Sequence, residues 1–129
     1  MPYKTIISEE DLKNNIDNKD FIIFDSRCDI KDRGYGIDSY TEGHIPNSIF
    51  VDVDTDLASE KQPGTGRHPL PNVETFCDKL SHWGMDNNKQ AVIYDDAGGA
   101  FAGRMWWMLK WLGHENVAVL DGGLNSWVK

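Results

Sequence analysis

Apolar residues along the chain fall into short runs, and each run predicts a buried strand. The clearest run is 92–94, where β-branched and aromatic residues follow one another without a polar interruption. Such runs are typical of strands that are buried on both faces of a sheet. The other predicted strands lie at residues 3–7, 21–24, 48–53 and 117–120.

Between these runs, apolar residues recur every three or four positions, which predicts helices. Ser8 precedes several acidic residues and is expected to cap the first helix. Asn72 or Thr75 is expected to start the helix that Gly84 ends. Two short helical segments complete the pattern, one turn at residues 39–43 and a last helix that begins at Leu124.

The alternation of strands and helices predicts the fold class. It indicates an α/β protein with a mostly parallel, five-stranded sheet and helices on both faces. The connections between parallel strands should be right-handed. In such open sheets, ligands bind beyond the carboxyl ends of the strands.

The segment 91–112 is the centre of this pattern. Its strand leads into a loop of small residues around Gly98 and Gly99, and a helical pattern starts at Ala100. That helix is apolar nearly all round, which is typical of a buried helix. A glycine loop that opens onto a helix N-terminus can direct backbone N–H groups at an anion. The simpler interpretation is a structural turn that lets helix and strand pack closely.

Composition excludes several classes of partner. The 129 residues suit one domain, and the net charge of -8 argues against nucleic acid or an anionic membrane surface as the main partner. No apolar run approaches the roughly twenty residues of a membrane span. The two cysteines, Cys28 and Cys77, form no metal-ligand motif, so we expect no metal, no cofactor and a cytoplasmic protein with reduced thiols.

Four segments stand out along the chain: IIFDSR (22–27), GHIPNSIFVDVD (43–54), VIYDDAGGAFAGRMWW (92–107) and VLDGGLNSWV (119–128). Taken together in this order, they resemble the rhodanese-type sulfurtransferases. The paired tryptophans at 106–107 and the RHPLP sequence at 67–71 favour the N-terminal domain of the two-domain thiosulfate and 3-mercaptopyruvate enzymes. The resemblance implies a rhodanese-like fold over residues 1–129 and a C-terminal catalytic rhodanese domain as partner.

The resemblance also implies why this chain alone should be inactive. In the family, a cysteine that opens the loop after the fourth core strand takes sulfur from small donors as a persulfide. It then passes that sulfur to cyanide or a thiol. Here Asp96 holds this position, and a carboxylate cannot carry a persulfide. We expect Asp96 to occupy the anion site of the loop, whose residues are Asp96, Ala97, Gly98, Gly99, Ala100 and Phe101.

Two further residues match positions that the family's mercaptopyruvate branch uses. Asp54 and His68 are implied to face the catalytic cysteine across the cleft between domains. A histidine with a carboxylate partner near a thiol can hold or move a proton. The alternatives are that Asp54 caps the turn after its strand and that His68 is a solvated loop residue.

Other candidate residues have structural interpretations. Cys28 is expected to be a semi-buried thiol rather than a substitute nucleophile, and Cys77 a small apolar side chain on its helix. Asp25 and Arg27 are expected to form a charge pair of little functional weight. Trp106, Trp107 and Trp111 are assigned to the core or to an interface with the second domain.

Two alternative functions stay open. One is a free-standing, inactive rhodanese domain that acts as a binding or regulatory module. Exposed apolar residues would allow such a domain to form a homodimer. The other is phosphoryl transfer through Asp95 or Asp96 with Mg²⁺, for which Asp25 and Asp54 would supply further carboxylates.

Overall fold

The computed structural model describes residues 3–29, 31–32, 34–58 and 71–128. The strands form one sheet in the order β1-β5-β4-β2-β3, and each pairing between these strands is parallel. The predicted α/β class and parallel sheet are therefore confirmed. The strands are β1 (Ile6–Ile7), β2 (Phe21–Asp25), β3 (Ser48–Phe50), β4 (Gln90–Tyr94) and β5 (Val117–Leu120).

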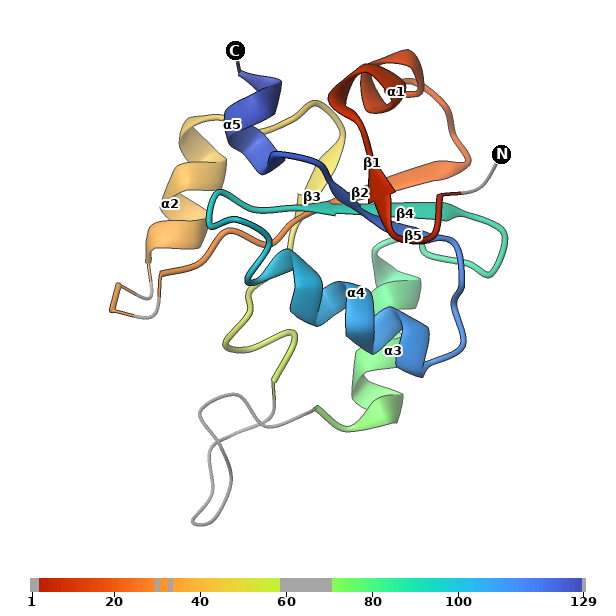
Figure 1. Ribbon diagram of the computed structural model, residues 1–129. Coiled ribbons are helices and arrows are strands. Elements are labelled where there is room, and N and C mark those ends of the chain that lie inside the picture. The colour runs from red at the N-terminus through yellow and green to blue at the C-terminus, as the bar shows by residue number, and fades with distance from the viewer. Residues whose placement is uncertain (1–2, 30, 33, 59–70, 129) are drawn as a thin grey trace.

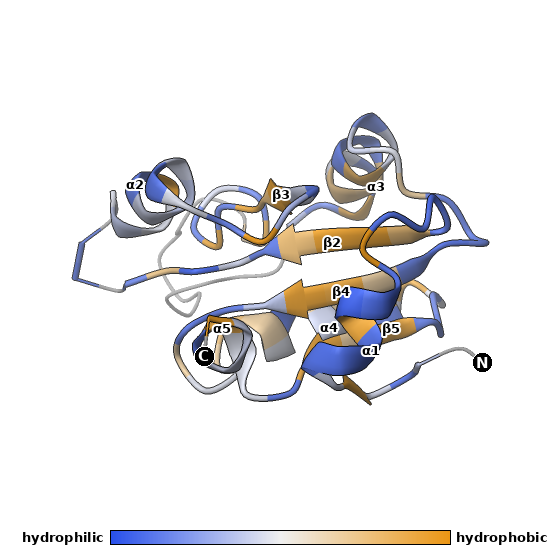
Figure 2. Ribbon diagram, turned by 90° about the horizontal axis from the view of Figure 1, so that it is seen from above, coloured by the Kyte–Doolittle hydropathy of each residue, from blue (hydrophilic) through white to orange (hydrophobic). Residues whose placement is uncertain are grey.

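Helices cover both faces of the sheet, as predicted (Figure 1). Helices α1 (Glu9–Asn14) and α5 (Gly123–Trp127) lie on one face, and α3 (Val73–His82) and α4 (Ala102–Trp111) lie on the other. Helix α2 (Tyr35–Glu42) lies beyond the carboxyl end of β2 (Figure 2). This arrangement places α2, the start of α4 and the start of α5 around the carboxyl ends of the strands.

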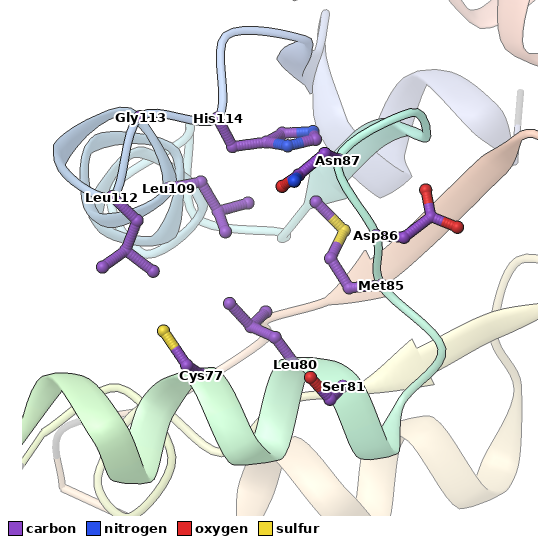
Figure 3. Close-up of a pocket in the computed structure, with 10 residues that line it drawn as sticks. All are labelled: Cys77, Leu80, Ser81, Met85, Asp86, Asn87, Leu109, Leu112, Gly113 and His114. Atoms are coloured by element: carbon purple, nitrogen blue, oxygen red, sulfur yellow. The ribbon is translucent and has the colours of Figure 1, made fainter.

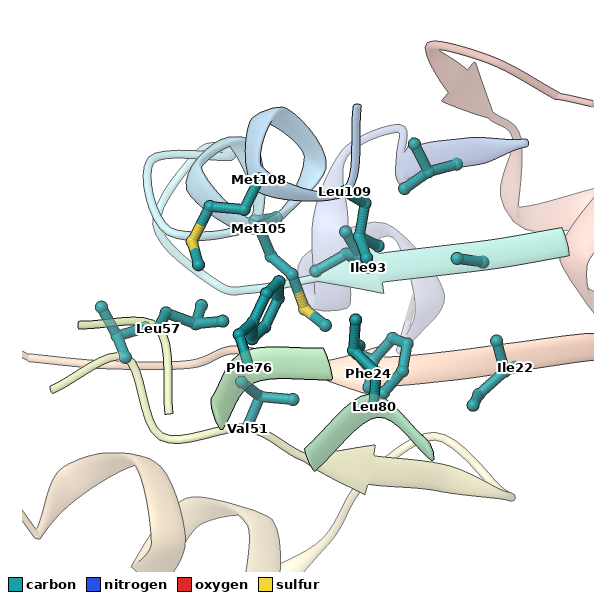
Figure 4. Close-up of a cluster of buried hydrophobic side chains, with 14 residues drawn as sticks. Ile22, Phe24, Val51, Leu57, Phe76, Leu80, Ile93, Met105, Met108 and Leu109 are labelled. Atoms are coloured by element: carbon teal, nitrogen blue, oxygen red, sulfur yellow. The ribbon is translucent and has the colours of Figure 1, made fainter. Parts of the chain in front are cut away.

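The two faces of the central strands supply two separate cores. On β2, Ile22 and Phe24 pack with residues of α3 and α4 (Figure 4), whereas Ile23 lies in the other core cluster, with Leu12 of α1. This alternation follows from the two-residue period of a strand. All of β4 is buried, so the prediction of a strand covered on both faces is confirmed. Figure 2 shows the resulting apolar character of β2 and β4.

The predicted caps are confirmed. Ser8 caps α1, since its Oγ accepts a hydrogen bond from the N–H of Asp11 at 3.1 Å. Asn72 caps α3 through hydrogen bonds from Glu74 and Thr75. Gly84, just beyond α3, has a φ of 95°, the left-handed conformation that favours glycine after a helix.

Helix α2 differs most from the sequence-based expectation. A loop up to residue 38 and one turn at 39–43 were expected, but the helix already begins at Tyr35. The N-cap residue, Gly34, has no side chain that could cap the helix, and the buried residue of the helix is Gly36. A Cβ at Gly36 would collide with the carbonyl oxygen of Arg27, so close packing replaces the missing apolar stripe. The strands β1 and β3 are also shorter than expected.

Helix α4 is buried on only one side, so the expectation of a helix buried all round is wrong. Trp107 and Trp111 are 48% and 44% exposed, and their rings stack with centroids 5.9 Å apart. Trp106 is half-buried, and its Nε1 donates hydrogen bonds to the carbonyl oxygens of Lys4 and Val117. The cluster therefore divides into one structural tryptophan and one exposed aromatic pair.

Within the described ranges, no helix combines the length and the apolar character that crossing a membrane requires.

Candidate functional site

The loop after β4 is organised around the carboxylate of Asp95. Its Oδ1 accepts hydrogen bonds from the N–H groups of Ala97 and Gly99 at 3.0 and 2.9 Å. Its Oδ2 accepts from Phe101 and Ala102 at 2.9 and 2.8 Å. Asp95 is 1% exposed and lies at the N-terminus of α4, where the helix dipole favours negative charge. The anion position of this loop is therefore filled by the chain's own side chain.

The expectation that Asp96 fills this position is wrong by one residue. Asp96 is half-buried, and its Oδ2 accepts a hydrogen bond from the hydroxyl of Tyr35 on α2. This hydrogen bond, followed by burial, raises the pKa of Tyr35. Neighbouring side chains at the end of a strand point to opposite sides, so only one of the two aspartates can enter the loop.

The Gly122–Gly123 pair braces the same loop from the other side. The N–H of Leu124 donates to the carbonyl oxygen of Asp95 at 3.0 Å. Gly123 has a φ of 59°, and a Cβ there would lie 2.5 Å from that carbonyl oxygen. Glycine is therefore required for α5 to approach the loop so closely. The Gly122–Gly123 turn therefore helps to fix the position of the loop that contains Gly98 and Gly99.

A pocket of about 220 Å³ opens between this loop and the start of α5. The charged side chains in its described lining are the carboxylates of Asp96 and Asp121. Two carboxylates repel an anionic substrate such as thiosulfate. The full lining is Ile6, Asp96, Gly98, Gly99, Val119, Leu120, Asp121, Gly122, Gly123 and Asn125.

A second pocket, of about 210 Å³, lies where α3 and α4 end, near the amino ends of β4 and β5 (Figure 3). Leu80, Met85 and Leu109 give it an apolar wall, and Cys77 and His114 also line it. Cys77 is exposed, so the expectation that it packs as a small apolar side chain is wrong. This pocket lies away from the carboxyl ends where the loop residues gather.

A buried charge network joins β2 to β4. Asp25 is 0% exposed and accepts from Arg27 Nη2 at 2.7 Å and from the Tyr94 hydroxyl at 2.8 Å. Arg27 also donates to the carbonyl oxygen of Gly43 at 2.7 Å. Burial alone would lower the pKa of Arg27, but Asp25 raises it above its usual value. The expected charge pair is confirmed, and its burial gives it structural weight that a surface pair lacks.

Asp54 lies in the turn 52–57 that follows β3 and is half-buried. The N–H groups of Asp54 and Thr55 both donate to Oδ1 of Asp52, at 2.9 and 3.3 Å. Asp52 therefore supplies the cap within this turn, the role considered as the alternative for Asp54. His68 lies outside the described residues, so its pairing with Asp54 stays a prediction.

Cys28 lies close to the same turn. It is half-buried and packs against the core cluster that contains Phe24 and Phe76. Burial, followed by the charges of Asp54 and Asp52, raises the pKa of its thiol to about 11. The reactive thiolate is scarce at neutral pH, which supports the interpretation of Cys28 as an inert thiol.

The carboxylates needed for a magnesium-dependent phosphoryl transfer are already used. Asp25 is bound to Arg27 and Tyr94, and Asp95 is bound to four backbone N–H groups. Among the residues with described positions, no three His, Cys, Asp or Glu side chains come together as a metal site. The geometry therefore does not favour this alternative.

Comparison with known proteins gives a consistent result. The "Rhodanese-like domain" family model matches residues 8–129. A Pseudomonas aeruginosa protein named "Probable 3-mercaptopyruvate sulfurtransferase" is 41% identical over 95% of this chain and 44% of its own length. The structure of a 3-mercaptopyruvate sulfurtransferase from Leishmania major matches with a TM-score of 0.87 and 31% identity, over 95% of this chain and 33% of that one.

The Escherichia coli 3-mercaptopyruvate sulfurtransferase structure gives a TM-score of 0.84 at 30% identity. That match covers 98% of this chain and 48% of the E. coli protein. The chain therefore spans less than half the length of each of these relatives.

Proposed function

Because the chain belongs to the rhodanese-like domain family, we propose that it is the N-terminal, non-catalytic domain of a two-domain thiosulfate or 3-mercaptopyruvate sulfurtransferase. The observation that carries this proposal is the loop after β4. Asp96 stands where the family resemblance places the nucleophilic cysteine, and Asp95 takes the N–H groups that would stabilise a thiolate. The acidic pocket beside the loop supports the same conclusion.

The chemistry would take place on a cysteine of the second domain. Its thiolate attacks the outer sulfur of thiosulfate and releases sulfite, or attacks the sulfur of 3-mercaptopyruvate. In the second case the C–S bond breaks and the carbon fragment takes up a proton to become pyruvate. Either donor leaves a persulfide, whose outer sulfur passes to cyanide or a thiol. Asp54 and His68 would hold or move the proton that the 3-mercaptopyruvate reaction requires.

The exposed tryptophan pair supports an interface with a partner domain. Trp107 and Trp111 form a stacked apolar surface on α4, and aromatic residues are enriched at protein interfaces. The proposed occupant is the C-terminal catalytic rhodanese domain. The same surface favours the second candidate function, a free-standing binding or regulatory module that pairs as a homodimer. A cytoplasmic location stays a prediction in both cases.

The isolated chain should form no persulfide. After incubation with thiosulfate, and separately with 3-mercaptopyruvate, the intact mass should be unchanged, and cyanide should release no thiocyanate. The reason is that Asp96 replaces the nucleophile and the Cys28 thiol stays protonated. A gain of one sulfur atom that cyanide removes would show that Cys28 or Cys77 is a working nucleophile and would contradict the proposal.

Adding a catalytic rhodanese domain, in trans or as a fusion, should produce sulfur transfer from 3-mercaptopyruvate. Asp54→Asn and His68→Gln should each lower kcat by about 10²-fold, the lower end of the usual contribution of a positioned proton-transfer group. Asp78→Asn, on the exposed side of α3, is the matched control and should leave the rate unchanged. Equal rates for all three variants would show that this domain takes no part in the chemistry and would favour the binding-module alternative.

A further inference from the structure

The turn 52–57 is closed by its own hydrogen bonds. The N–H of Asp56 donates to the carbonyl oxygen of Asp52 at 2.7 Å, and the N–H of Asp52 donates to Oδ2 of Asp56 at 2.9 Å. With the Asp52 cap on Asp54 and Thr55, these bonds make the turn a compact unit. Its place in the molecule is therefore set by the groups that attach it to the rest of the fold.

Val53 and Leu57 bury part of the turn in the core, and two cations on different helices bind its described polar groups. Arg104, in the first turn of α4, donates from Nε and Nη2 to the carbonyl oxygen of Leu57, at 3.0 and 2.7 Å. Lys79 on α3 donates to the carbonyl oxygen of Thr55 and to Oδ1 of Asp56, at 2.9 and 3.0 Å. Burial lowers the pKa of Arg104, whereas a third of the Lys79 side chain is exposed. The contact that Arg104 makes with the turn is therefore better shielded from solvent than the contact that Lys79 makes.

Arg104 also links the turn to the loop after β4. The first N–H of α4, that of Ala102, is held by Oδ2 of Asp95 at 2.8 Å. Arg104 follows two residues later in the same helical turn. The Asp95 carboxylate, which fixes the loop, therefore also fixes the backbone from which the Arg104 side chain extends. Leu57, the residue that Arg104 binds, is itself fully buried in the core cluster of α3 and α4.

We propose that Arg104 is a positioning residue for sulfur transfer. It holds the turn 52–57, which carries Asp54, against the start of α4 and so against the loop that begins at Asp96. The role in sulfur transfer rests on the function proposed above. The fixing of the turn is a property of this chain and is tested without a second domain.

Cys28 reports on the position of the turn. Its thiol pKa is raised to about 11 by burial and then by the charges of Asp54 and Asp52. If the turn moves away, water reaches Cys28 and both charges recede, so the thiol pKa falls. At pH 8, well below this pKa, each unit of decrease multiplies the thiolate fraction by about ten.

The test is the rate of Cys28 alkylation by iodoacetamide at pH 8, measured by intact mass in a Cys77→Ser background. Arg104→Gln should react about tenfold faster than the parent, and Arg104→Lys should lie between them because it keeps one charged donor. Lys110→Gln is the matched control on the same helix. Lys110 binds the carbonyl oxygen of Glu115, away from the turn, and its loss should leave the rate unchanged.

Thermal unfolding of each variant separates loss of fold from loss of positioning. Arg104→Lys keeps one charged donor and should stay folded even where Arg104→Gln does not. The inference is overturned if both Arg104 variants, folded, react at the parental rate. In the two-domain form, Arg104→Lys should lower kcat with little change in KM. If Cys28 is alkylated faster in Arg104→Lys but kcat does not fall, Arg104 fixes the turn and has no effect on sulfur transfer. If Asp54→Asn also left kcat unchanged, the role of Asp54 in the proposed function would fail as well.

Discussion

Replacing Arg27 by methionine should lower the free energy of unfolding by about 3–5 kcal/mol, because it leaves the charge of Asp25 buried without its partner. Asp25 is fully buried and loses three side-chain contacts from the guanidinium in this variant. Among the described residues, the hydrogen bonds that remain to it come from the hydroxyl of Tyr94 and the backbone N–H of residue 27. For a domain of this size the midpoint of thermal unfolding should fall by roughly 10–20 °C.

The double variant Asp25→Asn with Arg27→Met should be less damaging than Arg27→Met alone, because no uncompensated charge remains. Lys13→Met is the surface control. Lys13 pairs with Glu9 at 3.6 Å with both side chains largely exposed, and its loss should cost less than about 0.5 kcal/mol. If Arg27→Met costs no more than Lys13→Met in urea unfolding, the buried pair has been assigned the wrong role.

Replacing Asp95 by asparagine should lower the free energy of unfolding by about 3 kcal/mol, the second largest effect expected, because it leaves buried N–H donors unsatisfied. Its carboxylate accepts four N–H groups, whereas an asparagine offers one acceptor oxygen and turns an NH₂ group toward two of these donors. Asp96→Asn is the adjacent control. Its side-chain oxygen can still accept from Tyr35, so it should cost less than about 1 kcal/mol.

The comparison of these two adjacent variants decides which aspartate fills the loop. Urea unfolding gives the stabilities, and amide hydrogen exchange at Gly99 and Ala102 reports locally on the loop. Faster exchange should appear with Asp95→Asn and be absent with Asp96→Asn. The reverse order would restore the expectation, drawn from the sequence, that Asp96 is the residue held by the N–H groups.

The sequence predicted the order of the strands and the two capping residues correctly because both depend on local chemistry, although β1 and β3 are shorter than expected. The residues of β5 were predicted to the residue, and Ser8 and Asn72 cap their helices as expected. Helix α2 was missed in large part because it has neither a capping side chain nor an apolar stripe. The buried residue of this helix, Gly36, packs closely against the backbone carbonyl oxygen of Arg27, and no helical periodicity in the sequence indicates that contact.

The candidate site was located from the sequence but was not resolved in detail. The loop residues follow the central strand as predicted, and that was enough to place them at the carboxyl edge of the sheet. Which of Asp95 and Asp96 enters the loop depends on the register of β4 against its neighbours. The attachment of Arg104 to Leu57 joins residues 47 apart, which no local pattern indicates.

The sequence by itself determined the α/β class, the parallel sheet and the family, because apolar periodicity and short motifs are local properties of the chain. Only the tertiary structure decided that Asp95 fills the loop, that Trp107 and Trp111 stay exposed, and that Arg27 is buried against Asp25. The physical reason is that burial and hydrogen-bond partners depend on which elements meet in space. A charged or aromatic residue has the same letter in the sequence whether the fold buries it or leaves it in water.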